Sequence, residues 1–424
     1  MTLSEKDKQF IWHPYTPLQS VIENIPVVSG KGALLYDENG KDYIDAVSSW
    51  YVNLHGHSHP YIAKKLFEQA NKLEHVIFAG FTHQPAIELA ERLIGILPSN
   101  QKKIFYSDNG STAVEVAIKM AIQYWLNKGE KRQTIIAFEN SYHGDTFGAM
   151  SVSDRSIFTN PFNDLLFEVK FIPTPDTHNI DDLIKQVDII SQQNNVAAFI
   201  YEPLLQGTGS MRIYPANELN QLLQHIKSKH VLCIADEVLT GFYRTGKFFA
   251  GDYITELPDL VCLSKGLTGG TMALGVTSCS QTIVDAFDTT DKTKTFYHGH
   301  SYTANPLACT AALASLDLLQ DDACLKNINR IEEQHSGFIK ELQGISNVEN
   351  PRQLGTTLAF EVKTNSEHSY TNPIRDIIYK KFIENGVILR PLGNTVYIFP
   401  PYCITEEQLN KVYEVIKTVL NQIG

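Results

Sequence analysis

Short apolar runs alternate with longer amphipathic stretches through the middle of the chain. Runs typical of buried strands occupy residues 104–106, 134–138, 197–201, 231–235 and 260–263. Between several of them the apolar residues recur with helical spacing, as in 113–125 and 218–227. This alternation predicts βαβ units and an α/β domain with a mainly parallel sheet. Ligands of such sheets bind at the carboxyl ends of the strands, so polar residues directly after each run are the candidates for a site.

The two ends of the chain have a different pattern. Residues 32–45 predict a hairpin with its turn at 37–40. Near the other end, 357–362 and 395–399 resemble strands, and a capping box at 405–408 opens an amphipathic closing helix. We therefore expect both ends to form one smaller α+β domain. The predicted division is 1–60 and 311–424 for the small domain and 61–310 for the large one.

Composition restricts the class of protein. Of the 424 residues, 43% are apolar and 20% are charged, which is ordinary for a soluble globular protein. The net charge of −11 argues against nucleic acid or an anionic membrane as the main partner. The six cysteines contain no Cys-x-x-Cys pair, so neither a disulfide framework nor a metal site is predicted. The polar N-terminus and the lack of a long apolar run predict a cytoplasmic location.

Three polar signals follow successive predicted strands. The first is the segment 107–112, in which Gly110 lets the backbone approach a ligand and Ser111 offers a hydroxyl group. Because a helix begins directly afterwards, its free N–H groups and dipole favour an anion. Taken alone, such a segment is more often an ordinary helix N-cap.

The second and third signals are an acid and a lysine. Asp236 follows the run at 231–235, and a carboxylate there is costly unless a positive group meets it. Lys265 follows the run at 260–263, where desolvation favours the neutral amine of a Schiff-base nucleophile. Singly, a structural ion pair and a solvated surface lysine are the commoner explanations. Together with the anion cradle, they match what pyridoxal phosphate (PLP) requires.

A longer set of motifs resembles the class III aminotransferases, which are fold-type I PLP enzymes. The resemblance implies that Asp236 pairs with the pyridine nitrogen, that Lys265 forms the Schiff base, and that Tyr142 stacks on the cofactor ring. It extends over nearly the whole chain. The matching residues are Ile234-Ala235-Asp236-Glu237-Val238, Thr240-Gly241-Phe242, Arg244-Thr245-Gly246, Pro258-Asp259, Ser264-Lys265-Gly266, Tyr142-His143-Gly144, Glu202-Pro203 with Gly207, and Asn305-Pro306-Leu307-Ala308.

Three further segments resemble one subfamily of class III. These are Trp-His-Pro-Tyr-Thr at 12–16, Ser-Ser-Trp-Tyr at 48–51 and Arg-Pro-Leu-Gly-Asn at 390–394. That subfamily converts 8-amino-7-oxononanoate to 7,8-diaminononanoate in biotin synthesis, with S-adenosylmethionine as the usual amino donor. The resemblance implies that Tyr15 and Trp50 line the substrate pocket with Tyr142, that Tyr15 belongs to the catalytic set, and that Arg390 binds the carboxylate of the oxo acid.

The segment 298–305 departs from the commonest form of that subfamily. It has His-Ser-Tyr at 300–302 where many members have Pro-Thr-Phe. It resembles the corresponding segment of other class III enzymes, which implies a homodimer with Ser301, or the nearby Thr303, holding the PLP phosphate across the subunit boundary. Gly299 is then expected at the substrate and His300 at the cofactor, although the sequence leaves the role of the imidazole open.

Other functions remain compatible with the same scaffold. Lysine is an alternative amino donor, and 4-aminobutyrate, ornithine or another ω-amino acid is an alternative substrate. An aminomutase would keep the amino group and need no donor. A non-catalytic protein with this fold would lack Lys265 or Asp236, and both are present.

Overall fold

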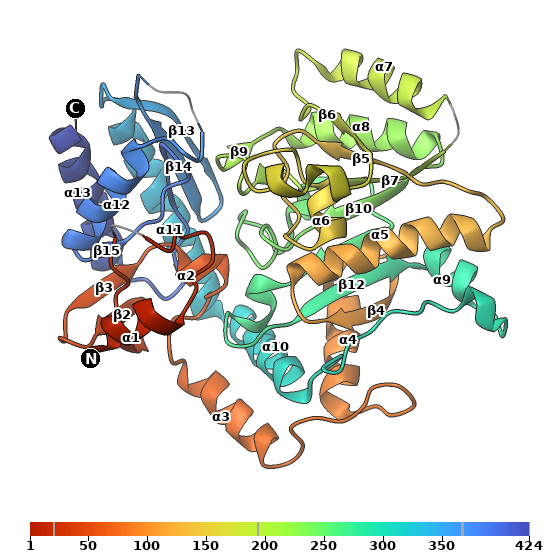
Figure 1. Cartoon of the computed structure of the whole chain (residues 1–424), viewed down its shortest axis with the longest axis horizontal. Helices are drawn as coiled ribbons and strands as arrows, with labels where there is room; N and C mark the ends of the chain where they lie inside the picture. Colours follow the sequence, from red (N-terminus) through yellow and green to blue (C-terminus); the bar gives the residue numbers. More distant parts are fainter. Residues whose placement is uncertain (20–21, 193–194, 366–368, 424) are drawn as a thin grey trace.

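The computed structural model describes residues 1–19, 22–192, 195–365 and 369–423. Its centre is a seven-stranded sheet in the order β4-β12-β11-β10-β7-β5-β6 (Figure 1). Only β12 runs against its neighbours, so the predicted mainly parallel sheet is confirmed. The strands are β4 (Gln101–Ser107), β5 (Thr134–Phe138), β6 (Val169–Ile172), β7 (Val196–Tyr201), β10 (Leu232–Asp236), β11 (Leu260–Leu263) and β12 (Gly275–Ser280).

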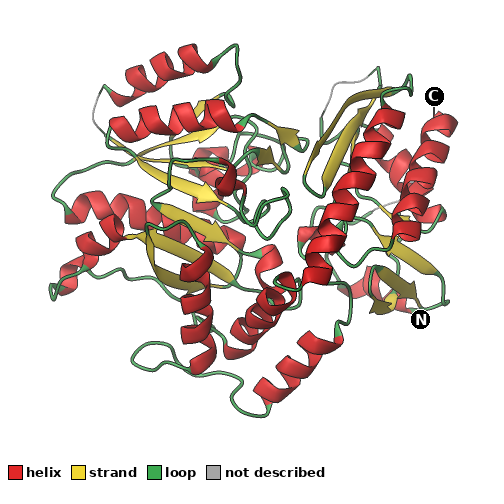
Figure 2. Ribbon diagram, turned by 180° about the vertical axis from the view of Figure 1, so that it is seen from behind, coloured by secondary structure: helices red, strands yellow, loops and turns green. Residues whose placement is uncertain are grey.

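Helices cover both faces of this sheet, as the views from the front and from behind show (Figures 1 and 2). Successive residues of β5 enter different apolar clusters: Ile135 packs with the cluster of α5 (Gly110–Asn127), and Ile136 with that of α8 (Ala216–Ser228). A strand buried on both faces needs apolar side chains in succession, which explains the unbroken runs in the sequence.

Strands from both ends of the chain meet in one of the smaller sheets. The predicted hairpin is present as β2 (Leu34–Asp37) and β3 (Asp42–Asp45), and β3 pairs in parallel with β15 (Val387–Ile388) from the far end of the chain. A second sheet joins β13 (Val348–Leu354), β14 (Thr357–Val362) and β16 (Thr395–Ile398). The boundaries at residues 60 and 310 stay our own division of the chain.

The remaining helices connect and flank these sheets. The predicted capping box is confirmed, because the Thr405 and Gln408 side chains each accept the other residue's backbone N–H. No helix in the described ranges is long and apolar enough to cross a membrane. The other elements are β1 (Val27–Lys31), β8 (Leu205–Gln206), β9 (Arg212–Ile213), α1 (Leu3–Phe10), α2 (Ser48–Tyr51), α3 (Pro60–Ala70), α4 (Gln84–Ile96), α6 (Phe147–Val152), α7 (Ile180–Ser191), α9 (Gln281–Phe287), α10 (Pro306–Leu319), α11 (Asp322–Leu342), α12 (Ile374–Glu384), α13 (Glu406–Ile423) and the 3-10 helices η1 (Asn160–Leu165), η2 (Ala250–Tyr253), η3 (Lys265–Thr268) and η4 (Lys292–Lys294).

Candidate active site

The carboxyl ends of the parallel strands open into a cavity of about 770 Å³. Segments from both ends of the chain close its other side, with Tyr15 and Trp50 from the beginning and Arg390 from the end. The structure therefore brings together residues that are up to 375 positions apart in sequence, counted from Tyr15 to Arg390. The predicted site residues that line the cavity are Tyr15, Trp50, Gly110, Ser111, Tyr142, Asp236, Lys265 and Arg390.

Lys265 follows β11 and is the first residue of η3. Its backbone has a φ of 46°, a left-handed conformation that is uncommon outside glycine and is often found at functional sites. Burial lowers the pKa of the amino group, and the nearby carboxylates of Asp236 and Glu202 act in the opposite direction. Within the described ranges the amine forms neither a hydrogen bond nor an ion pair; it lies 5.3 Å from the centre of the Tyr51 ring. This uncommitted amine is suited to act as a nucleophile.

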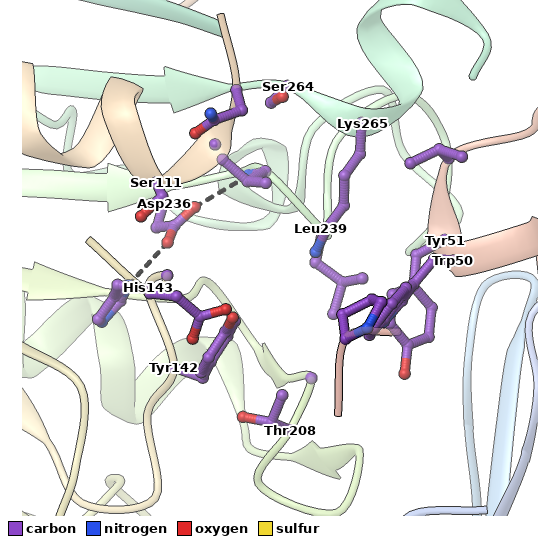
Figure 3. Close-up of a pocket in the computed structure, with 18 of the residues that line it drawn as sticks. Trp50, Tyr51, Ser111, Tyr142, His143, Thr208, Asp236, Leu239, Ser264 and Lys265 are labelled. Atoms are coloured by element: carbon purple, nitrogen blue, oxygen red, sulfur yellow. Dashed lines mark hydrogen bonds and ion pairs between the residues drawn. The ribbon is translucent and has the colours of Figure 1, made fainter. Parts of the chain in front are cut away.

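Asp236 is the last residue of β10 and is only 4% exposed. One carboxylate oxygen accepts a hydrogen bond from Nδ1 of His143 at 2.7 Å, and the other accepts the backbone N–H of Val238 at 3.1 Å. These two donors stabilise a negative charge where desolvation disfavours one. In Figure 3 the Lys265 side chain extends into the cavity between this pair and the aromatic residues Trp50 and Tyr51.

A tight backbone cradle surrounds the first turn of α5. A Cβ atom on Gly110 would lie 2.6 Å from Cγ1 of Val238, and one on Gly144 would lie 2.2 Å from Oγ of Ser111. Both positions therefore require glycine. Oγ of Ser111 also accepts the backbone N–H of Thr146 at 3.0 Å. The start of a helix at such a cradle is an arrangement that can bind a phosphate.

Aromatic side chains form the wall opposite the strand ends. The rings of Tyr15 and Trp50 meet edge to face at 5.4 Å, and the hydroxyl groups of Tyr15 and Tyr142 lie 3.1 Å apart. Tyr15 also donates a hydrogen bond to the carboxylate of Asp145. Burial and then this acid raise the pKa of Tyr15, so its phenol stays protonated.

Arg390 supplies a positive charge to the same wall. Its guanidinium carbon lies 4.7 Å from the centre of the Trp50 ring, within reach of a cation–π contact. In the part of the chain that the structure describes, the guanidinium forms neither a hydrogen bond nor an ion pair. A free guanidinium fork facing a cavity can bind a carboxylate through two parallel hydrogen bonds.

The segment 299–301 does not reach the cavity of the single chain. Gly299, His300 and Ser301 are absent from its described lining, and Ser301 is exposed. The carbonyl of Ser301 accepts a hydrogen bond from Nε2 of His75 at 2.6 Å. Their predicted contacts involve a second subunit, so these three residues stay predictions.

Sequence reasoning assigned no role to two residues of the site. His143 holds Asp236, and Glu202 lies in the same cavity after β7. Glu202 lies directly after an apolar run, which is the pattern that made Asp236 a candidate, so the sequence could have revealed it. No comparable pattern marks His143, which is notable in the sequence only as the neighbour of Tyr142.

Comparison with known proteins decides the family. The family model "Aminotransferase class-III" matches residues 17–420. This chain belongs to the class III aminotransferases. It is 46% identical to the adenosylmethionine-8-amino-7-oxononanoate aminotransferase of Synechococcus elongatus, over 97% of this chain and 99% of the relative. The enzyme of the same name from Helicobacter pylori is 36% identical, over 99% and 98% of the two chains.

Solved structures confirm fold-type I and a PLP-dependent aminotransferase. The adenosylmethionine-8-amino-7-oxononanoate aminotransferase of Methanocaldococcus jannaschii has a TM-score of 0.95 at 34% identity, covering 99% of this chain and 98% of its own. A PLP-bound amine transaminase from an uncultivated Pseudomonas species has a TM-score of 0.91 at 27% identity, covering 98% and 99%.

The residues of the cavity fit PLP. Lys265 offers an uncommitted amine for the aldehyde, Asp236 offers a buried negative charge for the protonated ring nitrogen, and Gly110 and Ser111 at the start of α5 line the cavity where helix N–H groups can bind a phosphate. Each of the three parts of the cofactor thus has a chemically matched group in one cavity.

Proposed function

We propose that this chain is a cytoplasmic homodimeric enzyme that transfers an amino group from S-adenosylmethionine to 8-amino-7-oxononanoate, giving 7,8-diaminononanoate in biotin synthesis. The observation that carries this assignment is that Tyr15, Trp50 and Arg390, from the three subfamily segments, meet in one cavity with Lys265. The names and full-length similarity of the relatives support it.

Each residue has a role in this proposal. When bound, PLP supplies an aldehyde that links to amines and a ring that withdraws electrons. Lys265 holds the aldehyde at rest, and its amine later moves a proton at the substrate carbon. Asp236, held by His143, keeps the ring nitrogen protonated. Ser111 and the N–H groups of the α5 start hold the phosphate, and Tyr142 packs against the ring.

The aromatic wall and Arg390 recognise the two substrates. Rings such as Trp50 and Tyr15 can stack on adenine, and their faces attract the positive sulfonium of S-adenosylmethionine. The free guanidinium of Arg390 binds the carboxylate of the oxo acid. Binding of each substrate in this partly enclosed cavity also excludes water from the reacting amine.

A second subunit completes the site in this proposal. Ser301, with Gly299 and His300 beside it, would then reach the phosphate of the partner's cofactor. Large apolar side chains of the same region are exposed in the single chain, including Phe81 at 64% and Tyr302 at 66%. Such exposure is typical of an interface. Sedimentation of the PLP-loaded protein should show a dimer, and a monomer with full PLP occupancy would contradict this part of the proposal.

The amino donor is tested by adding each candidate alone to PLP-loaded enzyme and following the cofactor's absorption band. S-adenosylmethionine should convert the band, leaving amine-loaded cofactor on the protein. Conversion of the band by lysine but not by S-adenosylmethionine would make lysine the donor, and the assignment of 8-amino-7-oxononanoate as the acceptor would be unchanged. Rapid conversion by 4-aminobutyrate or ornithine alone would overturn the biotin assignment. If no donor leaves amine-loaded enzyme after its removal, an aminomutase explains the site better.

A further inference from the structure

Glu202 joins two loops that line the cavity through its carboxylate. It is 4% exposed and directly follows β7. Oε1 accepts the backbone N–H of Tyr142 at 3.0 Å, and Oε2 accepts the backbone N–H of Gly207 at 2.9 Å. Tyr142 and Gly207 belong to different loops, and both line the cavity. One buried side chain therefore fixes the relative positions of two loops.

The surroundings of Glu202 fit these two contacts. A Cβ atom on Gly207 would lie 2.5 Å from Cδ2 of the buried Leu239, so glycine lets the backbone lie here without displacing that side chain. The main chain of Glu202 is also held, because the Tyr214 hydroxyl donates to its carbonyl. Tyr142 is fixed at the other end by the hydroxyl of Tyr15, 3.1 Å from its own. Tyr142 is thus held through its backbone N–H by Glu202 and through its hydroxyl group by Tyr15.

We propose that Glu202 is a positioning residue whose ionised carboxylate sets the Tyr142 ring against the cofactor and holds the Gly207 loop beside it. The part of this inference that concerns the cofactor rests on the proposed role of Tyr142. Only a carboxylate accepts hydrogen bonds at both oxygens. A protonated acid or an amide presents one acceptor and one donor, so one of the two N–H groups would lose its partner.

The charges around Glu202 make this arrangement sensitive to pH. Burial raises the pKa of Glu202 to about 7, while His143 lowers it and Asp236 raises it; Lys265 and Tyr214 also face the group. As the pH falls through about 7, protonation removes one acceptor and loosens one loop. The ordered arrangement is therefore present above this pH and weakened below it.

Glu202→Gln tests the contact without the cofactor. In cofactor-free protein at pH 8, amide hydrogen exchange at Tyr142 or Gly207 should accelerate about tenfold or more, since a hydrogen bond to a charged group is lost. Glu237→Gln is a matched control. Glu237 is equally buried after the neighbouring strand, yet it accepts the N–H groups of Ala250 and Gly251 and contacts neither loop. Exchange unchanged at Tyr142 and Gly207 in Glu202→Gln would overturn the inference.

The PLP-loaded protein gives a second readout. The visible circular dichroism of the cofactor should change in Glu202→Gln and stay unchanged in Glu237→Gln. Cofactor release from the unaltered chain should accelerate as the pH falls through about 7, and this dependence should be absent in Glu202→Gln. Glu202→Asp, which keeps the charge, should retain the pH dependence, and it replaces the glutamine variant if that variant does not fold. A pH dependence that survives in Glu202→Gln would refute the role of the carboxylate. Failure of PLP to bond to Lys265 would instead refute the proposed function and leave the exchange test intact.

Discussion

Replacement of Arg390 by alanine should selectively weaken binding of the oxo acid. The guanidinium faces the cavity 4.7 Å from the centre of the Trp50 ring, and no acid within the described ranges pairs with it. A hydrogen bond to a charged group contributes about 1.5–3 kcal/mol, so the loss corresponds to about a ten- to hundredfold higher dissociation constant. Arg390→Lys should recover only part of the loss, because a lysine keeps the charge without the planar fork.

The two half-reactions, measured separately in single turnovers, distinguish this role from a general defect. The donor has its carboxylate beside the reacting carbon, whereas that of the oxo acid is at the far end of its chain. One fixed guanidinium cannot suit both, so the donor half-reaction should change less. Arg375→Ala is the matched control, because Arg375 stacks on Tyr370 at 5.1 Å but does not line the cavity. Equal damage to both halves, or unchanged affinity for the oxo acid, would refute the assignment of Arg390.

Three other substitutions test the site and the fold. Lys265→Ala should abolish transamination and the borohydride-reducible link to PLP, and full activity would end the assignment. Asp236→Asn should keep the circular dichroism of the fold but slow turnover by at least about tenfold, because a neutral amide does not hold the ring nitrogen protonated; unchanged turnover would give that role to another group. His335 is buried between Tyr413 and the Thr356 carbonyl, and burial lowers its pKa to about 4. As the pH falls from about 6.5 to 4, His335 therefore binds a proton in the unfolded chain before it does so in the folded chain. The stability advantage of the unaltered chain over His335→Gln, measured by urea unfolding, should shrink by about 3 kcal/mol across that range, and a constant difference would contradict the reasoning.

The strands of the sheet could be predicted from the sequence where they are buried on both faces and are therefore apolar throughout. The apolar runs of β5, β7, β10 and β11 all match strands, because strands covered on both faces need little else. The strand β12 was not predicted, since Thr277, Ser278 and Ser280 interrupt its apolar pattern. In the structure Thr277 donates to the carbonyl of Ala113 and Ser278 to Oε1 of Gln101, both at 2.7 Å. These partners are more than 150 positions away, and no local pattern reveals them.

The same limit applies to the candidate site. Asp236 and Glu202 share one local pattern, a carboxylate at the end of a buried strand. This pattern indicates only that hydrogen-bond donors must meet the carboxylate, not which donors they are. The structure supplies different donors: the His143 imidazole and the backbone N–H of Val238 for Asp236, and the backbone N–H groups of Tyr142 and Gly207 for Glu202. The two donors of Glu202 belong to separate loops, so this acid holds the loops in place, whereas the imidazole beside Asp236 supports a charge that can act on a ligand. The distinction between a residue that contacts the cofactor and one that positions its neighbours thus depends on the donors, and these are fixed by the fold.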